Sequence, residues 1–172
     1  MTFVIAIAIM VVIACLAVVI IKGLSSPKKL ETVKRLLKQG KNQAAAKLAK
    51  QMVTKEPQNY AIHYYLGKAY LADNRAELAL MEFKTVNEHA LFDASLPEVP
   101  FRKEYANLLM QFNQNDAALR ECLLLTKLDP ATSDHYFNAG RLYEKTNRKD
   151  LALSVYQKCR SPIYVRRVHR RR

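Results

Sequence analysis

The sequence lacks the short motifs by which catalytic and metal-binding chains are usually recognised. Its 172 residues contain no glycine-rich phosphate loop, no GxSxG nucleophile elbow and no HExxH zinc motif. No two cysteines form a CxxC pair, and the two outside the N-terminal segment are expected to be small core residues: Cys122 and Cys159. The four histidines stand far apart along the chain. We therefore expect no enzyme activity, no metal site and no cofactor.

Acidic residues are nearly absent from residues 22–55, which hold ten Lys or Arg and one Glu, a net charge of +9. Residues 56–159 hold twelve basic and fourteen acidic residues, a net charge of −2, and six arginines follow in residues 160–172. A nucleic-acid-binding domain needs basic residues on its working face, so the near-neutral middle argues against a nucleic-acid partner. We expect the Arg-rich tail, 163–172, to be solvated, with contacts to lipid, RNA or an acidic partner as alternatives.

Charge is also absent from residues 3–21, an unbroken apolar run of 19 residues. As a helix this run is about 28 Å long, close to the hydrocarbon thickness of a bilayer. We therefore predict a transmembrane helix over residues 1–21 and a basic juxtamembrane linker over 22–29. Basic residues follow the run and none precedes it, which places the rest of a single-pass membrane protein in the cytoplasm.

Three other interpretations of the apolar run are open. A cleaved signal peptide is disfavoured, because the run is long and no basic residue precedes it. The four residues ending at Cys15 are similar to a lipoprotein cleavage box, but the chain stays apolar from Leu16 to Ile21. A buried core helix is the third alternative.

The middle of the chain repeats itself. Alanines at equivalent places are separated by 34, 39 and 34 residues: Ala45, Ala79, Ala118 and Ala152. The longer spacing contains a five-residue insertion around Leu91 to Pro100, where two prolines are expected to bar a helix. Each unit is predicted to be two helices joined by a turn, at Gly40-Lys41-Asn42, Asp73-Asn74, Asn113-Gln114-Asn115 and Thr146-Asn147.

The order Leu-Gly, Tyr, Ala, aromatic, Pro at a period of 34 resembles the tetratricopeptide repeat, over about residues 26–162. The resemblance implies an all-α fold, in which the transmembrane helix is followed by an α-solenoid of about four helix hairpins. The array, residues 30–162, would divide into hairpins at about 30–57, 60–91, 99–130 and 133–162. A plain helical bundle is the alternative, but a bundle has no reason to keep this period.

The same resemblance implies that the first helix of each hairpin lines a concave groove for a protein or peptide partner. The groove residues that it assigns are Tyr64, Lys68, Leu71, Lys103, Asn107, Met110, Phe137, Asn138, Arg141 and Glu144. In chaperone-binding members a carboxylate clamp uses three of these positions, those of Lys103, Asn107 and Asn138. Val168 stands where the clamp needs a basic residue, so a clamp is not expected here.

The basic residues after the apolar run have two interpretations. They fix the membrane topology, or they also contact anionic lipid, where each gains about 1 kcal/mol. The candidates for the lipid surface are Lys28, Lys29, Lys34, Arg35 and Lys38.

The last hairpin lacks the polar capping helix that usually ends such an array, since Pro162 follows soon after Cys159. Either another chain covers this end, or the natural protein is longer, or the end is weakly stable. We therefore expect that two copies of the chain can associate through the uncapped last repeat.

These features together predict a membrane-anchored scaffold or adaptor, of bacterial type, that binds a partner protein in its groove. The alternative is a membrane-associated chaperone or a secretion or assembly accessory. The plan of a short span, a basic stalk and repeats with an irregular spacer is similar to the lipopolysaccharide assembly protein B family. The metal-binding CxxC region of that family is missing here.

Overall fold

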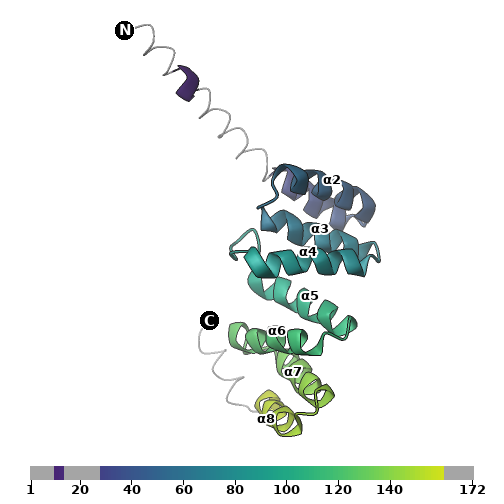
Figure 1. Cartoon of the computed structure of the whole chain (residues 1–172), viewed down its shortest axis with the longest axis vertical. Helices are drawn as coiled ribbons and strands as arrows, with labels where there is room; N and C mark the ends of the chain where they lie inside the picture. Colours follow the sequence, from purple (N-terminus) through teal and green to yellow (C-terminus); the bar gives the residue numbers. More distant parts are fainter. Residues whose placement is uncertain (1–9, 14–27, 161–172) are drawn as a thin grey trace. The chain divides into compact units, whose positions relative to one another are not determined.

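The computed structural model describes residues 10–13 and 28–160 (Figure 1). Apart from residues 10–13, the predicted transmembrane helix at 1–21 lies outside the described residues, as do most of the linker at 22–29 and the tail at 163–172. Among the described residues, no helix has the length and apolar character needed to cross a bilayer. The membrane span therefore stays a prediction.

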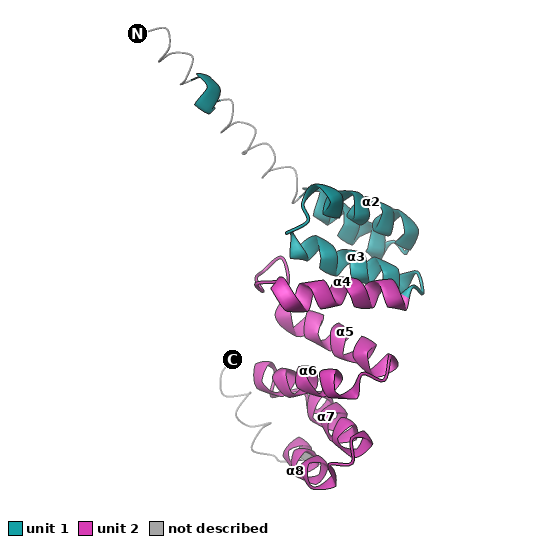
Figure 2. Cartoon of the chain, in the orientation of Figure 1, with its two compact units in different colours: residues 1–75 teal, residues 76–172 magenta. Residues whose placement is uncertain are grey.

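The regular secondary structure of the described residues is entirely α-helical, as predicted, and the chain divides into two compact units at residue 75 (Figure 2). In unit 1 the helical residues 28–38 are followed by α2 (Asn42–Lys55) and α3 (Tyr60–Ala72). The described part of unit 2, up to residue 160, contains five helices in chain order: α4 (Ala76–His89), α5 (Glu98–Gln111), α6 (Asn115–Leu128), α7 (Ser133–Lys145) and α8 (Lys149–Arg160).

The four turns predicted from the sequence are confirmed, and each contains one residue in the left-handed region. These residues are Gly40 (φ 70°), Asn74 (φ 58°), Asn113 (φ 54°) and Asn147 (φ 60°). Gly and Asn adopt this conformation at the lowest cost, which is why they end helices. In each turn the following N–H donates to a carbonyl five residues back, for example Arg75 N to Tyr70 O at 2.8 Å and Arg148 N to Tyr143 O at 2.8 Å.

Small residues lie where neighbouring helices approach closely. Ala45, Ala79, Ala118 and Ala152 are all buried. Gly140 shows the reason most clearly, because a Cβ there would lie 2.2 Å from Cε1 of Tyr156. The α7 backbone therefore approaches the α8 aromatic ring more closely than any other residue type would allow.

The expectation that two prolines bar a helix around residues 91–100 is wrong for Pro100, which is the third residue of α5. The N–H groups of the first helical turn have no intrahelical acceptor, so a proline there removes no hydrogen bond. Residues before α5 form an ordered loop instead. The Asp93 carboxylate accepts hydrogen bonds from the backbone N–H groups of Ser95 at 2.8 Å and Leu96 at 3.0 Å. It also accepts one from the Ser95 hydroxyl, which is the largest cause of the lowered Asp93 pKa, and the two backbone bonds lower it further.

The centre of unit 2 combines aromatic packing with a buried ion pair. Phe101 is fully buried and lies 5.6 Å from the rings of both Phe83 and Tyr105 and 5.4 Å from that of Phe92. Arg102 donates to Glu98 and to Glu121, each at 2.7 Å, with only 12% of the Arg102 and 7% of the Glu121 side chain exposed. The Arg102–Glu121 pair joins α5 to α6. The Arg102 guanidinium also lies 5.0 Å from the centre of the Phe92 ring, which belongs to the inserted loop.

Candidate functional site

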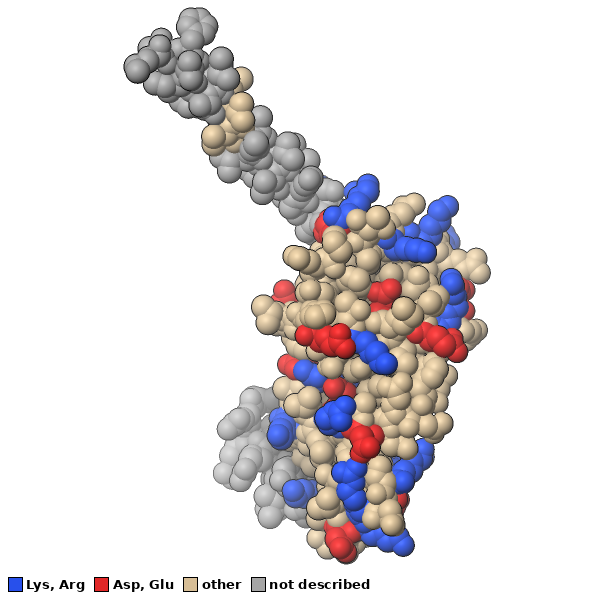
Figure 3. Space-filling view, viewed as in Figure 1, with Lys and Arg blue, Asp and Glu red and all other residues tan. Residues whose placement is uncertain are grey.

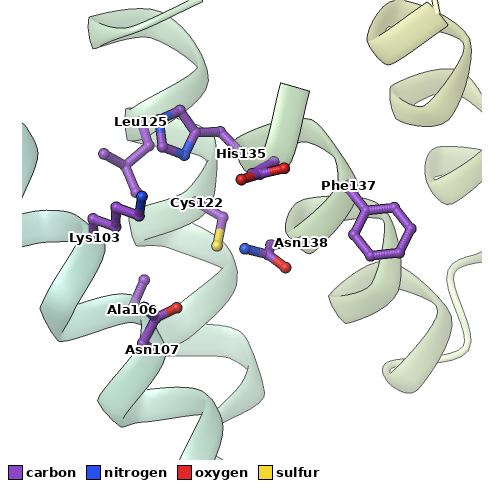
Figure 4. A pocket seen from close by; sticks show the side chains of 9 residues that line it. Lys103, Ala106, Asn107, Cys122, Leu125, His135, Phe137 and Asn138 are labelled. Atoms are coloured by element: carbon purple, nitrogen blue, oxygen red, sulfur yellow. The ribbon is translucent and has the colours of Figure 1, made fainter. Parts of the chain in front are cut away.

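A pocket of about 280 Å³ opens between α5, α6 and α7 of unit 2 (Figure 4). Its floor is apolar and consists of the buried residues Ala106, Cys122 and Leu125. Four of the ten groove residues assigned by the repeat resemblance come together around it: Lys103, Asn107, Phe137 and Asn138. The other five lining residues were not expected in a groove: Ala106, Cys122, Leu125, Asp134 and His135.

The rim of the pocket is polar on both sides. Lys103 and Asn107 project from α5, while Asp134 and Asn138 project from α7. The Asn138 amide points over the Cys122 thiol, and Asn107 lies on the α5 side of the opening (Figure 4). A side-chain amide carries both a donor and an acceptor, the same pair that a peptide backbone offers. The pocket therefore presents two amides and two opposite charges above an apolar floor.

The surroundings fix the protonation state of one lining residue, Cys122, and the orientation of another, His135. Burial raises the pKa of the Cys122 thiol to about 12, so it is a protonated apolar group and not a nucleophile near neutral pH. His135 is buried and its Nε2 lies 3.3 Å from Oδ2 of Asp129, which also accepts a 2.7 Å hydrogen bond from the Thr132 hydroxyl. The bonds from Thr132 and then His135 lower the Asp129 pKa. These contacts hold the entry to α7 in place.

Two further groove residues of unit 2, Arg141 and Glu144, follow Phe137 along α7 outside the pocket lining. Phe137 is 50% exposed, and its ring lies 5.9 Å from the Arg141 guanidinium and 6.0 Å from the Tyr156 ring. The Tyr156 hydroxyl donates to Glu144 at 3.1 Å. An exposed aromatic residue beside arginine is a common anchor in protein interfaces. Met110 is half-buried and does not line the pocket.

The three groove residues assigned to unit 1 lie differently. Only 2% of Tyr64 is exposed, so its ring belongs to the core. Lys68 lies over this ring at 5.2 Å and its amino group is 3.5 Å from the Tyr64 hydroxyl. Leu71 is half-buried. The sequence pattern places all three on one helix face, but it does not reveal that the tyrosine packs inward.

Of the five candidate lipid-surface residues, four are exposed: Lys28, Lys29, Arg35 and Lys38. Lys34 is the exception, because its amino group pairs with Glu31 at 2.7 Å and lies 5.2 Å from the Tyr65 ring. The hydrogen bond to Glu31 is the main cause that raises the Lys34 pKa. Lys34 therefore ties residues 28–38 to α3.

Apolar side chains are exposed on α8, namely Leu151 and Leu153. Self-association through this end stays a prediction. In the part of the chain that the structure describes, no group of three His, Cys, Asp or Glu residues is arranged to hold a metal ion.

Comparison with known families identifies the helix hairpins. Tetratricopeptide-repeat families match residues 36–96 and residues 105–161. The chain contains tetratricopeptide repeats. Among curated proteins, no sequence matches this one significantly.

Solved tetratricopeptide-type structures share the fold. One crystal structure of MamA protein superposes with a TM-score of 0.65 at 18% identity, covering 84% of this chain and 74% of that one. A MamA structure from AMB-1 gives a TM-score of 0.65 at 19% identity, covering 76% and 69%. A third, from MSR-1, gives 0.63 at 18%, covering 81% and 76%. At this identity the likeness establishes the all-helical repeat fold.

Proposed function

We propose that this protein is a scaffold that binds a segment of a partner protein in the pocket of unit 2 and is held at a membrane by its apolar run. The tetratricopeptide repeats support a protein-interaction role. The observation that carries the proposal is the convergence of Lys103, Asn107, Phe137 and Asn138 around one pocket.

The dimensions of the pocket favour a peptide side chain over a small-molecule cofactor. Its volume of about 280 Å³ lies at the lower limit of typical ligand cavities, which hold whole drug-sized molecules. The apolar floor suits one aliphatic or aromatic side chain, while the amides of Asn107 and Asn138 pair with the backbone beside it. Phe137 and Arg141 offer the next contact along α7.

The charges of the rim favour a partner segment that is polar overall. Lys103 and Asp134 lie on different helices, so the rim suits a segment that carries charges of both signs, not a purely acidic one. We propose no catalysis at this site, because the Cys122 thiol is protonated near neutral pH and His135 is held by Asp129.

Photo-crosslinking at the pocket rim tests this function. Benzoylphenylalanine in place of Phe137, in the full chain expressed in its native membranes, is expected to give one discrete crosslinked partner. The same probe in place of Leu124, an exposed α6 residue outside the pocket lining, is the matched control and is expected to give none. The double substitution Asn107→Ala and Asn138→Ala removes two hydrogen bonds of about 1 kcal/mol each, which weakens binding about thirtyfold.

The outcome also separates the two functional classes. One stoichiometric partner, lost in the double variant, supports a scaffold. A broad distribution of crosslinked proteins, insensitive to the double variant, supports the chaperone alternative instead. Equal crosslinking from Phe137 and Leu124 excludes the pocket as the site.

A further inference from the structure

Residues 28–38 carry three basic side chains on one exposed side, here named the basic face: Lys28, Arg35 and Lys38. At 100° per residue, Lys28 and Arg35 project within about 20° of each other, and Lys38 about 60° from Arg35. Leu30 and Val33 are buried on the other side of the helix. One side of the helix thus packs on the rest of unit 1, and the other side presents positive charge.

The helix of the basic face carries one carboxylate, that of Glu31, against five basic residues, so this side of the helix keeps a net positive charge. Glu31, the one acidic residue of this helix, is paired with Lys34 at 2.7 Å, so the two neutralise each other. Lys28 and Arg35 line an open cleft of about 470 Å³ together with Glu31 and Thr32. Where the first helices of unit 1 lie, Figure 3 shows more Lys and Arg than Asp and Glu on the visible surface.

The position of this face in the sequence indicates what covers it. Lys28 follows Ile21, the last residue of the apolar run, by seven residues. Seven residues span at most about 24 Å, so a bilayer that holds the run is within reach of the face. Such a tethered surface is present at high effective concentration, which a nucleic acid in solution is not.

We propose that the basic face docks on the negatively charged headgroups of an anionic bilayer, and that Lys34 takes no part because it is paired with Glu31 and lies over the Tyr65 ring. This inference rests on the membrane attachment in the proposed function. Each basic residue near an anionic leaflet shifts the ratio of docked to undocked protein about fivefold, so the three together shift it about a hundredfold. Salt weakens the effect, because the charges are exposed.

Fluorescence transfer from a single tryptophan to a dansyl lipid measures this docking. The chain contains no Trp, so Gln39→Trp introduces a unique donor. Residue 39 continues the same helix turn, since its N–H donates to Arg35 O at 3.0 Å. The full chain is reconstituted into vesicles of phosphatidylcholine, with or without phosphatidylserine. We expect stronger transfer with the anionic lipid, lost at high salt.

Two triple variants separate a specific face from general attraction. Lys28→Gln, Arg35→Gln and Lys38→Gln together are expected to abolish the increase. Lys47→Gln, Lys50→Gln and Lys55→Gln, exposed residues of α2, remove the same charge and are expected to preserve it. Circular dichroism checks that both variants keep their helices.

The failure modes are distinguishable. Equal transfer in neutral and anionic vesicles, or equal loss in both triple variants, overturns the docking face. Release of the full chain from vesicles by alkaline carbonate overturns the membrane attachment itself, and the docking proposal with it. Retention through that wash with no response to lipid charge leaves the anchored scaffold standing and rejects only this inference.

Discussion

The two units are built from the same kind of helix but use their charges in opposite ways. Residues 28–75 of unit 1 hold eleven basic and three acidic residues, a net charge of +8, whereas residues 76–160 of unit 2 hold eleven basic and twelve acidic, a net charge of −1. In unit 2, acidic residues pair internally with Arg102 and His135. Unit 2 therefore presents charges of both signs beside the amides of its proposed peptide site, as Lys103 and Asp134 do. Unit 1 presents an excess of positive charge, which suits the proposed contact with an anionic layer.

Phe101→Ala tests whether the aromatic cluster stabilises unit 2 alone, and we expect the largest effect here. The substitution leaves a cavity among Phe83, Phe92 and Tyr105, at a cost of about 3–5 kcal/mol in the free energy of unfolding. Hydrogen exchange is expected to lose protection in α5 and α6 while α2 and α3 keep theirs. Equal loss in both units would show that they unfold together.

Glu121→Gln and Glu31→Gln compare a buried ion pair with an exposed one. Breaking the Arg102–Glu121 pair leaves a largely buried guanidinium with Glu98 alone, which costs about 3 kcal/mol. The Lys34–Glu31 pair has 26% and 69% of its side chains exposed, so its loss costs less than about 1 kcal/mol. Urea unfolding measures both. A larger effect in the Glu31 variant would reverse the contrast between the units.

Gly140 and Gly40 are needed for different reasons, one for space and one for backbone conformation. Gly140→Ala forces the Tyr156 ring away and costs about 1–3 kcal/mol. Gly40→Asn is expected to cost less than about 0.5 kcal/mol, because asparagine occupies the same left-handed position in the other three turns and nothing lies within 4 Å. Thermal unfolding compares them, with Gly140→Ala in a Tyr156→Ala background as the control. If the Gly140 effect persists in that background, the clash is not its cause.

Asp129→Asn gives the smallest effect, and its signature is pH dependence. The folded-state pKa of Asp129 is lowered from the ordinary 3.8, chiefly by the Thr132 hydrogen bond, so the carboxylate stabilises the fold above that pH. The stabilisation is lost as the pH falls through the folded-state value. At pH 7 the Asp129→Asn variant is therefore expected to melt at a lower temperature than the parent protein. This difference in melting temperature is expected to shrink below about pH 3.8. In unit 1 the equivalent histidine is His63, whose Nε2 lies 3.0 Å from the carbonyl oxygen of Pro57. A backbone carbonyl does not titrate, unlike the Asp129 carboxylate.

The sequence predicted the helices and turns well because local chemistry determines them. Asn74, Asn113 and Asn147 mark helix ends through a backbone conformation that few other residues accept. Pro100 was mispredicted because its effect depends on where the helix starts, and the start is set by the Asp93 loop. That loop takes its shape from contacts that no local pattern reveals.

The candidate site was predictable only in part. The resemblance to the tetratricopeptide repeat assigned Lys103, Asn107, Phe137 and Asn138 to one groove, and the structure places them around one pocket. The resemblance could not show that α6 supplies the floor, since Cys122 and Leu125 occupy ordinary core positions of the repeat. It also could not separate Tyr64, which turns inward, from Phe137, which stays half exposed.

The asparagine turns have a consequence for how such a chain grows. Because the joint after α3, α5 and α7 has one backbone geometry and one hydrogen-bond pattern, it acts as a standard coupling. A duplicated gene segment of one period would therefore insert a hairpin whose internal turn already has this geometry. Lengthening the array then requires changes in the segment that leads to the next hairpin and in the side chains that face the new neighbour.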